Sequence, residues 1–421
     1  MTTSLNWPLI IREIKRKKFT PIISDRAFCQ FLPGYDSLID AWATEIQYPL
    51  GTSFNITRLA QFLSVKYGDV SKAEYLYFVK ANVLENAGDG NGKVKELDEG
   101  DLDTLPLTEV VDRLGVLPFT PEYENPLRIL ALLPIPIYIT TSYHTFMEEA
   151  LHAAGKNPRT EICYWDSKLK PVSTELNTQE YQSYLRDILS TYFTIEDLKN
   201  LCADLNFSHE DLPAETRSGM AREIITYLEQ RGRLPELAEY VKRERPRLSL
   251  QDPSDIEVDS DLDEGTAVNI PSVFSKESGY IPDEKNPLVY HLHGLETYPN
   301  SLVLTENDYL DFLVQIAKDK NSLIPDPVKT ALTMSSLLLL GYELQDWDFR
   351  VLYKGLITSR MRQRGGVNIC IQLKPTQGQV DQAQDFLQEY FKQAKFSIYW
   401  GNPQEFAQEL WQAWPDKKEE A

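Results

Sequence analysis

The stretch 287-PLVYHLHGL-295 places two histidines and a glycine at the end of a short apolar run. Such a run is typical of a buried strand, and alternation along a strand directs His291 and His293 to the same face. Open α/β sheets gather ligands and catalytic groups at the carboxyl ends of their strands. The chain has only five histidines. The stretch therefore predicts a functional site, with one of the two histidines as a general base.

Further apolar runs bounded by turn residues also predict strands. The predicted strands are Pro21–Ile23, Pro136–Thr141, Glu161–Trp165, Leu288–His293, Leu337–Leu340, Val367–Leu373 and Phe396–Trp400. Helical spacing of apolar residues lies between them, as at Leu38–Ile46, Phe146–Ala154, Asp308–Ala317, Asp346–Ile357 and Val380–Phe391. Strands that alternate with helices predict an α/β fold with a doubly wound, Rossmann-like parallel sheet.

The composition is acidic, with a formal net charge of -20 and a pI near 4.8. This charge repels phosphate backbones, and the short basic segment Lys242–Arg247 does not offset it, so no nucleic-acid partner is expected. Charged residues follow the first apolar residues too soon for a signal peptide, and no apolar run reaches a membrane-spanning length. We therefore expect a soluble, cytoplasmic protein.

The four cysteines are single and far apart, at Cys29, Cys163, Cys202 and Cys370. No C-x-x-C pair is present to hold zinc or to form a redox dithiol. The cysteines are expected to be reduced and mostly buried, and no metal site is expected.

Thr178–Arg245 carries no strand pattern and predicts a small all-α bundle. Thr194 and Asp197 have the spacing of a capping box at the start of a helix over Ile195–Leu205. Two further helices are predicted over Ser218–Glu229 and Leu234–Arg243.

A segment without lysine or arginine follows the bundle, and it holds seven acidic residues between Leu248 and Ser272. Repulsion among these charges and the scarcity of large apolar side chains predict a flexible linker. The expected organisation is an α/β domain in two parts, 1–175 and 273–421, interrupted by a helical insert at 176–246 and an acidic linker at 247–272.

Four sequence elements stand in the order found in the sirtuin family. They are TTSYH at 140–144, HG at 293–294, SLVLTENDY at 301–309 and LLLLGYELQDWD at 337–348. Over most of its length the chain therefore resembles the sirtuin-like proteins of bacteria. The resemblance implies the fold of that family and NAD as substrate or ligand.

The helical region has a separate resemblance. Tyr181–Pro246 is similar to the death-like effector-associated domains of bacterial conflict systems, through FTIEDL at 193–198, LC at 201–202, DLP at 211–213 and RGRL at 231–234. In that family such domains join an effector to a partner protein with a related domain. The resemblance implies recruitment or regulation and assembly into a homo-oligomer; a lid or a stabilising insert is the alternative.

In sirtuin-like enzymes the histidine of the H-G element takes a proton from a ribose hydroxyl as nicotinamide leaves, and the resemblance gives this role to His293. The ordinary pKa of histidine, about 6.5, makes a neutral imidazole available for it. His291 either orients His293 or is simply buried. Deacylases of the family carry a zinc module with two C-x-x-C pairs, which is lacking here. The resemblance therefore implies an NAD hydrolase (NADase) of anti-phage defence, in which water attacks the anomeric carbon.

Several residues depart from the family pattern. Ser24, Asp25 and Arg26 stand where the family has glycines that approach the pyrophosphate; Arg26 can clamp a phosphate, whereas Asp25 repels it. Ser142 replaces an asparagine that holds the nicotinamide ribose, and His144 replaces an aspartate that holds the carboxamide. With His293, these two are the predicted catalytic residues.

Other residues near strand ends are predicted to contact the nucleotide by position alone. They are Thr141, Gly294, Gly341, Tyr342, Gln372 and Gly401. Three functions stay open: an NAD-consuming effector, a catalytically silent nucleotide-binding sensor or scaffold, and a pure interaction protein.

Overall fold

The computed structural model describes most of the chain in separate ranges. These are 5–28, 32, 37–51, 55–68, 70–87, 97, 99–115, 125–166, 168–172, 185–186, 188–205, 207–208, 216–229, 231, 233–245, 268–274, 279–318, 323–342, 368–372, 380–393 and 395–415. The predicted helix Asp346–Ile357 lies outside the described residues, as does most of the predicted acidic linker.

The chain divides into two compact units. The first comprises Met1–Gly88, Val116–Asp166 and Ile281–Ala421, and the second comprises Asp89–Gly115 and Ser167–Tyr280. The second unit contains the predicted insert of 176–246 and also includes residues 89–115, 167–175 and 247–280. The domain boundaries expected from the sequence stay predictions.

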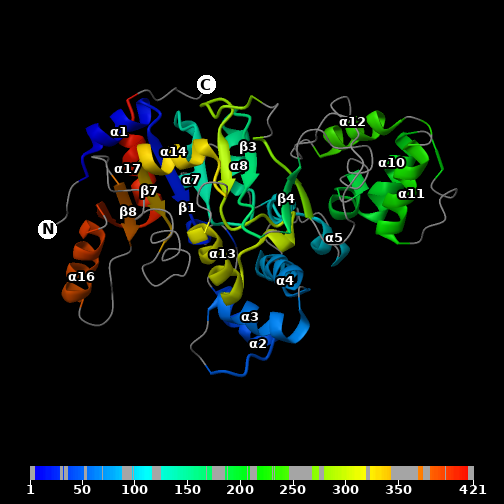
Figure 1. The fold of residues 1–421 in the computed structure, drawn as a ribbon, viewed down its shortest axis with the longest axis horizontal. Helices are drawn as coiled ribbons and strands as arrows, with labels where there is room; N and C mark the ends of the chain where they lie inside the picture. The colour runs from blue at the N-terminus through cyan, green and yellow to red at the C-terminus, as the bar shows by residue number, and fades with distance from the viewer. Residues whose placement is uncertain are drawn as a thin grey trace. The chain divides into compact units, whose positions relative to one another are not determined.

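The first unit is built on a seven-stranded sheet with the strand order β3-β6-β2-β1-β7-β8-β9, in which every neighbouring pair is parallel. The strands are β1 (Phe19–Ile23), β2 (Ile137–Thr140), β3 (Arg159–Ile162), β6 (Leu288–His291), β7 (Ser336–Leu340), β8 (Asn368–Gln372) and β9 (Phe396–Trp400) (Figure 1). All residues of β1, β2, β6, β7 and β8 are buried, as expected for central parallel strands. The predicted α/β fold is confirmed.

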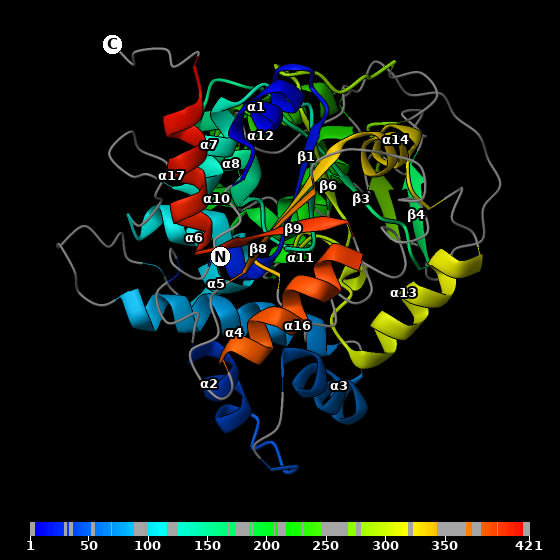
Figure 2. The same ribbon diagram turned by 90° about the vertical axis from the view of Figure 1, so that its left-hand side faces the viewer.

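Helices cover both faces of this sheet. Figure 2 shows α7 (Pro126–Leu132), α8 (Phe146–Ala153) and α17 (Pro403–Ala413) on one side of the strands, and α13 (Glu306–Lys318) and α14 (Asp326–Met334) on the other. The other helices that the structure describes in this unit are α1 (Trp7–Lys15), the one-turn η1 (Asp25–Ala27), α2 (Leu38–Glu45), α3 (Ile56–Tyr67), α4 (Val70–Ala87), η5 (Pro299–Ser301) and α16 (Val380–Gln393). This layering buries the apolar strands, and in sheets of this kind ligands bind at the strand ends.

The second unit contains a two-stranded parallel sheet that the pattern of apolar residues did not predict. Its strands are β4 (Leu169–Val172) and β5 (Val268–Pro271), and Leu169 lies opposite Val268. β5 therefore occupies the end of the segment expected to be a flexible linker. Four-residue strands that include a proline carry little alternation, which is why the pattern did not reveal them.

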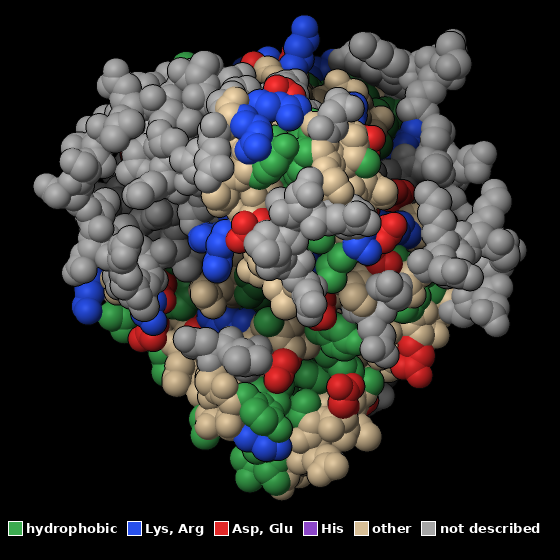
Figure 3. All heavy atoms as spheres, turned by 90° about the vertical axis from the view of Figure 1, so that its right-hand side faces the viewer, with side chains coloured by type: hydrophobic (Ala, Val, Ile, Leu, Met, Phe, Trp, Pro, Cys, Tyr) green, Lys and Arg blue, Asp and Glu red, His purple; other side chains and the backbone are tan. Residues whose placement is uncertain are grey.

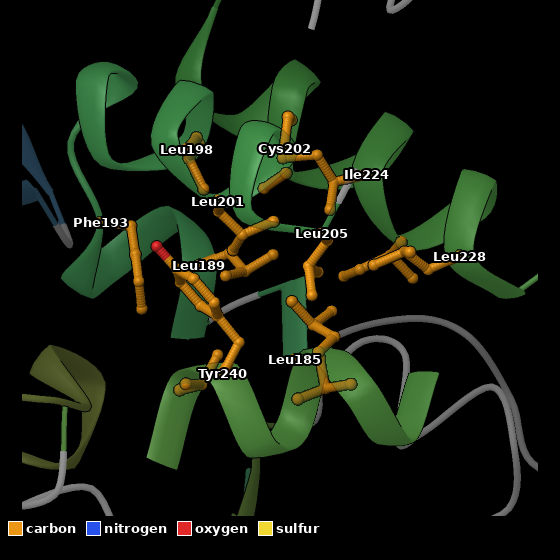
Figure 4. Close-up of a cluster of buried hydrophobic side chains, with 14 of the residues drawn as sticks. Leu185, Leu189, Phe193, Leu198, Leu201, Cys202, Leu205, Ile224, Leu228 and Tyr240 are labelled. Atoms are coloured by element: carbon orange, nitrogen blue, oxygen red, sulfur yellow. The ribbon is translucent and has the colours of Figure 1, made fainter. Parts of the chain in front are cut away.

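The helices whose bounds the structure describes in the second unit are α5 (Glu99–Thr104), α6 (Leu107–Arg113), α10 (Ile195–Asp204), α11 (Arg217–Glu229) and α12 (Leu234–Glu244). The predicted capping box at α10 is confirmed: the Asp197 backbone N–H donates to Thr194 Oγ1 at 3.1 Å, and the Thr194 N–H donates to Asp197 Oδ2 at 3.0 Å. Apolar side chains of α10, α11 and α12 meet in one core (Figure 4). On the face shown in Figure 3, acidic and basic side chains lie interspersed.

Truncation of the centre of this core provides a test of the bundle. Leu201 is fully buried on α10, and Leu201→Ala removes apolar contacts and leaves a cavity. We expect a loss of about 2–5 kcal/mol in the free energy of unfolding of the bundle, measured by denaturant unfolding of the whole chain. Ile195→Ala on the same helix is the control, because Ile195 is 40% exposed. Equal, small losses for both variants would contradict this core.

Candidate functional site

The carboxyl ends of four neighbouring strands are aligned by their register. Ile23 of β1 lies opposite Thr140 of β2 and Leu340 of β7, and Thr140 lies opposite His291 of β6. Hydrogen bonds continue this pairing one residue further, from the Thr141 N–H to the Ile23 carbonyl at 2.9 Å and from the Leu292 N–H to the Thr140 carbonyl at 2.8 Å. The predicted site residues that follow these four strands therefore share one edge of the sheet.

The switch point of the sheet lies between β1 and β7, because the chain continues from β1 to β2 on one side and from β7 to β8 on the other. Here Ser24 donates its hydroxyl to the Gly341 carbonyl at 2.5 Å. Gly341 has φ +83°, and a Cβ at this position would lie 2.6 Å from the backbone nitrogen of Ala27 on η1. Close packing of η1 thus accounts for this glycine, and its approach to a ribose stays a prediction.

Tyr342 and Gln372 also make hydrogen bonds within the protein. The Tyr342 hydroxyl lies 3.0 Å from Thr141 Oγ1 and donates to the Ile23 carbonyl at 3.2 Å. Gln372 Nε2 donates to the Tyr342 carbonyl at 2.6 Å. Gln372 on β8 lies four strands from β6, or roughly 19 Å, and Gly401 follows β9, one strand further. The structure therefore does not bring these two residues together with the histidines.

His144 and Asp25 come together from the ends of β2 and β1. His144 Nε2 lies 3.4 Å from Asp25 Oδ1, and the imidazole is surrounded by Phe28 and Phe146, with ring centroids 4.3 and 4.4 Å away. Neither ring nitrogen of His144 has a hydrogen-bond partner among the described residues. Arg26, the predicted phosphate clamp, is exposed on η1 beside this pair.

His293 lies in an apolar environment. Its ring contacts Tyr309 and Phe312 of α13 edge to face, with centroids 5.3 and 5.2 Å away. Burial lowers the pKa of His293 to about 3, so the imidazole is neutral at physiological pH. Within the described part of the chain, Nε2 has no hydrogen-bond partner.

His291 has different neighbours and is fully hydrogen-bonded. Its Nδ1 lies 2.9 Å from the Ser142 carbonyl oxygen, and its Nε2 lies 2.8 Å from Glu148 Oε1 of α8. Burial alone lowers the pKa of His291, but the charge and hydrogen bond of Glu148 overcome this effect and raise it. No pattern in the sequence points to Glu148, because its partner His291 lies 143 positions further along the chain.

Several buried polar atoms at the ends of β2 and β6 have no hydrogen-bond partner among the described residues. They are Ser142 Oγ, His144 Nδ1 and Nε2, and His293 Nε2. Since buried polar atoms are normally hydrogen-bonded, such a group is suited to a polar ligand. A nicotinamide riboside offers hydroxyls and a carboxamide, which are donors and acceptors, so these residues fit that end of NAD. Among the described residues, no three His, Cys, Asp or Glu side chains are placed to share a metal ion.

Comparison with known families gives two matches. Residues 259–395 match the model of a SIR2-like domain, and residues 185–246 match effector-associated domain 7. The first match contains the H-G element and β6 to β8, whereas β1, β2 and their site residues lie outside it. A search of curated proteins finds no match to the chain. Among the described helices, none is long and apolar enough to span a membrane.

Proposed function

Because this sirtuin-like chain combines a SIR2-like domain with an effector-associated domain, we propose that it is an NAD-consuming effector of a bacterial conflict system. The reaction is hydrolysis of NAD with release of nicotinamide. The observation that carries this proposal is a group of buried polar atoms on His293, Ser142 and His144 that have no hydrogen-bond partner among the described residues. Anti-phage defence in the cytoplasm is the proposed setting.

In the proposed reaction, the bond between the anomeric carbon and the nicotinamide nitrogen breaks, and nicotinamide leaves with the bonding electrons. Water adds to the anomeric carbon and loses a proton. The neutral imidazole of His293 takes a proton from a ribose hydroxyl as nicotinamide leaves and returns it to the same oxygen after water has added, so that only the proton from water is released to solvent. The ribose hydroxyl also gives His293 Nε2 the hydrogen-bond partner that it lacks among the described residues. Ser142 and His144 hold the ribose and the carboxamide.

The effector-associated domain supplies recruitment in this proposal. Its helices α10, α11 and α12 share one core. Leu201, Cys202 and Leu237 are fully buried in it. The bundle is therefore a folded module able to present a surface to a partner protein with a related domain. We propose that this contact, together with homo-oligomer formation, regulates NAD hydrolysis.

A second candidate function is a nucleotide-binding scaffold that does not turn NAD over. It is favoured by side chains at the ends of β1, β7 and β8, because Ser24, Tyr342 and Gln372 donate hydrogen bonds to the protein's own carbonyls. With these donors in use, a dinucleotide would be held by fewer contacts and less firmly in the geometry that hydrolysis requires.

Incubation of the purified chain with NAD distinguishes the two functions. We expect release of free nicotinamide, measured by chromatography, and faster release when the chain is fused to a domain that forces oligomerisation. Calorimetry with NAD and with ADP-ribose runs in parallel. Binding without release in either form supports the scaffold, and neither binding nor release overturns both functions.

A further inference from the structure

A series of buried and partly buried hydrogen bonds connects β3, α8 and β6 to the loop that follows β2. Thr160 of β3 donates its hydroxyl to Glu148 Oε1 of α8 at 2.9 Å. The same oxygen lies 2.8 Å from His291 Nε2, and His291 Nδ1 lies 2.9 Å from the Ser142 carbonyl oxygen. His291 is fully buried, and Glu148 is 5% exposed. The loop is thus held from the side of the sheet that carries β6 and β3.

The acceptors in this series determine where the hydrogens are. A carbonyl oxygen only accepts, so His291 Nδ1 carries a hydrogen. Nε2 faces a carboxylate oxygen and donates to it when Glu148 is ionised. His291 is then an imidazolium paired with a carboxylate, with both ring nitrogens donating.

Stability alone does not explain such a pair. Two charges lose their hydration when they are buried, and apolar residues of similar volume often replace a buried ion pair without loss of stability. The pair instead fixes the orientation of the His291 ring, because each ring nitrogen has its own partner: the Ser142 carbonyl for Nδ1 and Glu148 Oε1 for Nε2.

The group that it fixes is the backbone of Ser142. The Ser142 N–H donates to Thr140 Oγ1 at 2.9 Å, and the Ser142 carbonyl faces His291. The peptide groups on both sides of Ser142 are therefore hydrogen-bonded, whereas its hydroxyl is buried and has no partner in the described part of the chain. The two ring nitrogens of His144, two residues later, are also buried and have no hydrogen-bond partner among the described residues.

We propose that His291 and Glu148 form a positioning pair, which holds the loop after β2 so that the Ser142 hydroxyl remains free to bind the ribose of the nicotinamide riboside. This inference rests on the proposed function for the identity of the ligand. Neither residue takes part in bond breaking. Both act through the backbone of Ser142, since displacement of a binding group by about 1 Å can lower a rate by about 100-fold.

Two substitutions of His291 separate positioning from packing. In His291→Asn, the amide nitrogen takes the place of Nδ1 and still donates to the Ser142 carbonyl, whereas His291→Leu donates to neither partner. We expect His291→Leu to lower kcat for nicotinamide release at least 10-fold, and His291→Asn to stay within about threefold of the unsubstituted chain. Glu148→Gln removes the charge and is expected to fall between them.

Two controls address stability and surface effects. Asn402→Ala removes the capping box of α17 and destabilises the same unit away from the site. His152→Gln changes an exposed histidine on α8, the helix of Glu148. Both controls are expected to leave kcat unchanged. Equal losses of kcat in His291→Leu, His291→Asn and Asn402→Ala would show a purely structural role and overturn the positioning pair.

Hydrogen–deuterium exchange tests the pair without relying on turnover. We expect peptides covering 140–146 to exchange at least 10-fold faster in His291→Leu than in His291→Asn or Asn402→Ala. If the unsubstituted chain releases no nicotinamide but shows this pattern, the proposed function fails and the positioning role stands. If the loop exchanges equally in all three variants, the positioning role fails, whatever the activity with NAD.

Discussion

His293→Phe is expected to lower the rate of nicotinamide release by about 10²–10⁴-fold while the fold is retained, because the general base is lost. Phenylalanine keeps a ring between Tyr309 and Phe312, which contact His293 edge to face. It also removes Nε2, a buried nitrogen without a hydrogen-bond partner in the described residues. The free energy of unfolding should therefore stay within about 1 kcal/mol or rise. Turnover and denaturant unfolding are measured on the same preparation.

The pH dependence of stability is the control for this expectation. Burial lowers the pKa of His293 to about 3, so the folded chain leaves it neutral above that pH, whereas an unfolded histidine binds a proton below about 6.5. The contribution of His293 to stability is therefore lost as the pH falls from 6.5 towards 3, at about 1.4 kcal/mol per pH unit. This slope should be missing in His293→Phe. For the same reason, kcat/KM should show no inflection near pH 6.5 from this base. Full activity in His293→Phe would remove His293 from the reaction.

The sequence predicted the central strands of the large sheet because buried parallel strands are continuous apolar runs, and their alternation with helices indicates a parallel sheet. The edge strand β3 lies at Arg159–Ile162, two residues before the start of the predicted Glu161–Trp165, because its first residues are polar and not buried. The sequence also predicted that residues after different strands share an edge, since the ends of parallel strands lie together. Glu148 and the rings of Tyr309 and Phe312 did not emerge from it. Which face of α8 or α13 meets the strand ends depends on how each helix is rotated against the sheet, and the spacing of apolar residues sets that only coarsely.

Gly294 and Gly341 also show what cannot be predicted from the sequence alone. The sequence placed Gly294 and Gly341 at strand ends and assigned both to the nucleotide. The structure gives each a positive φ and a close contact within the protein, with Ser301 for Gly294 and with Ala27 for Gly341. Close approach by another segment of the chain selects glycine as strongly as approach by a ligand does. Contacts within the protein therefore explain both glycines, and their contact with a nucleotide stays a prediction.

Gly294→Ala is accordingly expected to be the most destabilising single substitution near the site. Gly294 has φ +86°, a conformation that costs an alanine about 1–2 kcal/mol. Its new Cβ would also overlap the backbone carbonyl of Ser301, and backbone cannot move aside as a flexible side chain can. We expect a total loss of about 2–5 kcal/mol in the free energy of unfolding. Because His293 precedes this glycine, nicotinamide release should fall by about 100-fold or more in the molecules that remain folded.

Gly155→Ala separates backbone strain from overlap. Gly155 lies in the same unit and has φ +72°, but a Cβ there would meet nothing within 4 Å. This variant should lose only the free energy of placing alanine at a positive φ, about 1–2 kcal/mol, and keep full activity. The difference between the two variants measures how tightly the segment around Ser301 is held against the H-G element. If both lose the same small amount, that segment yields to the new methyl group, and His293 is not fixed by the contact between Gly294 and Ser301.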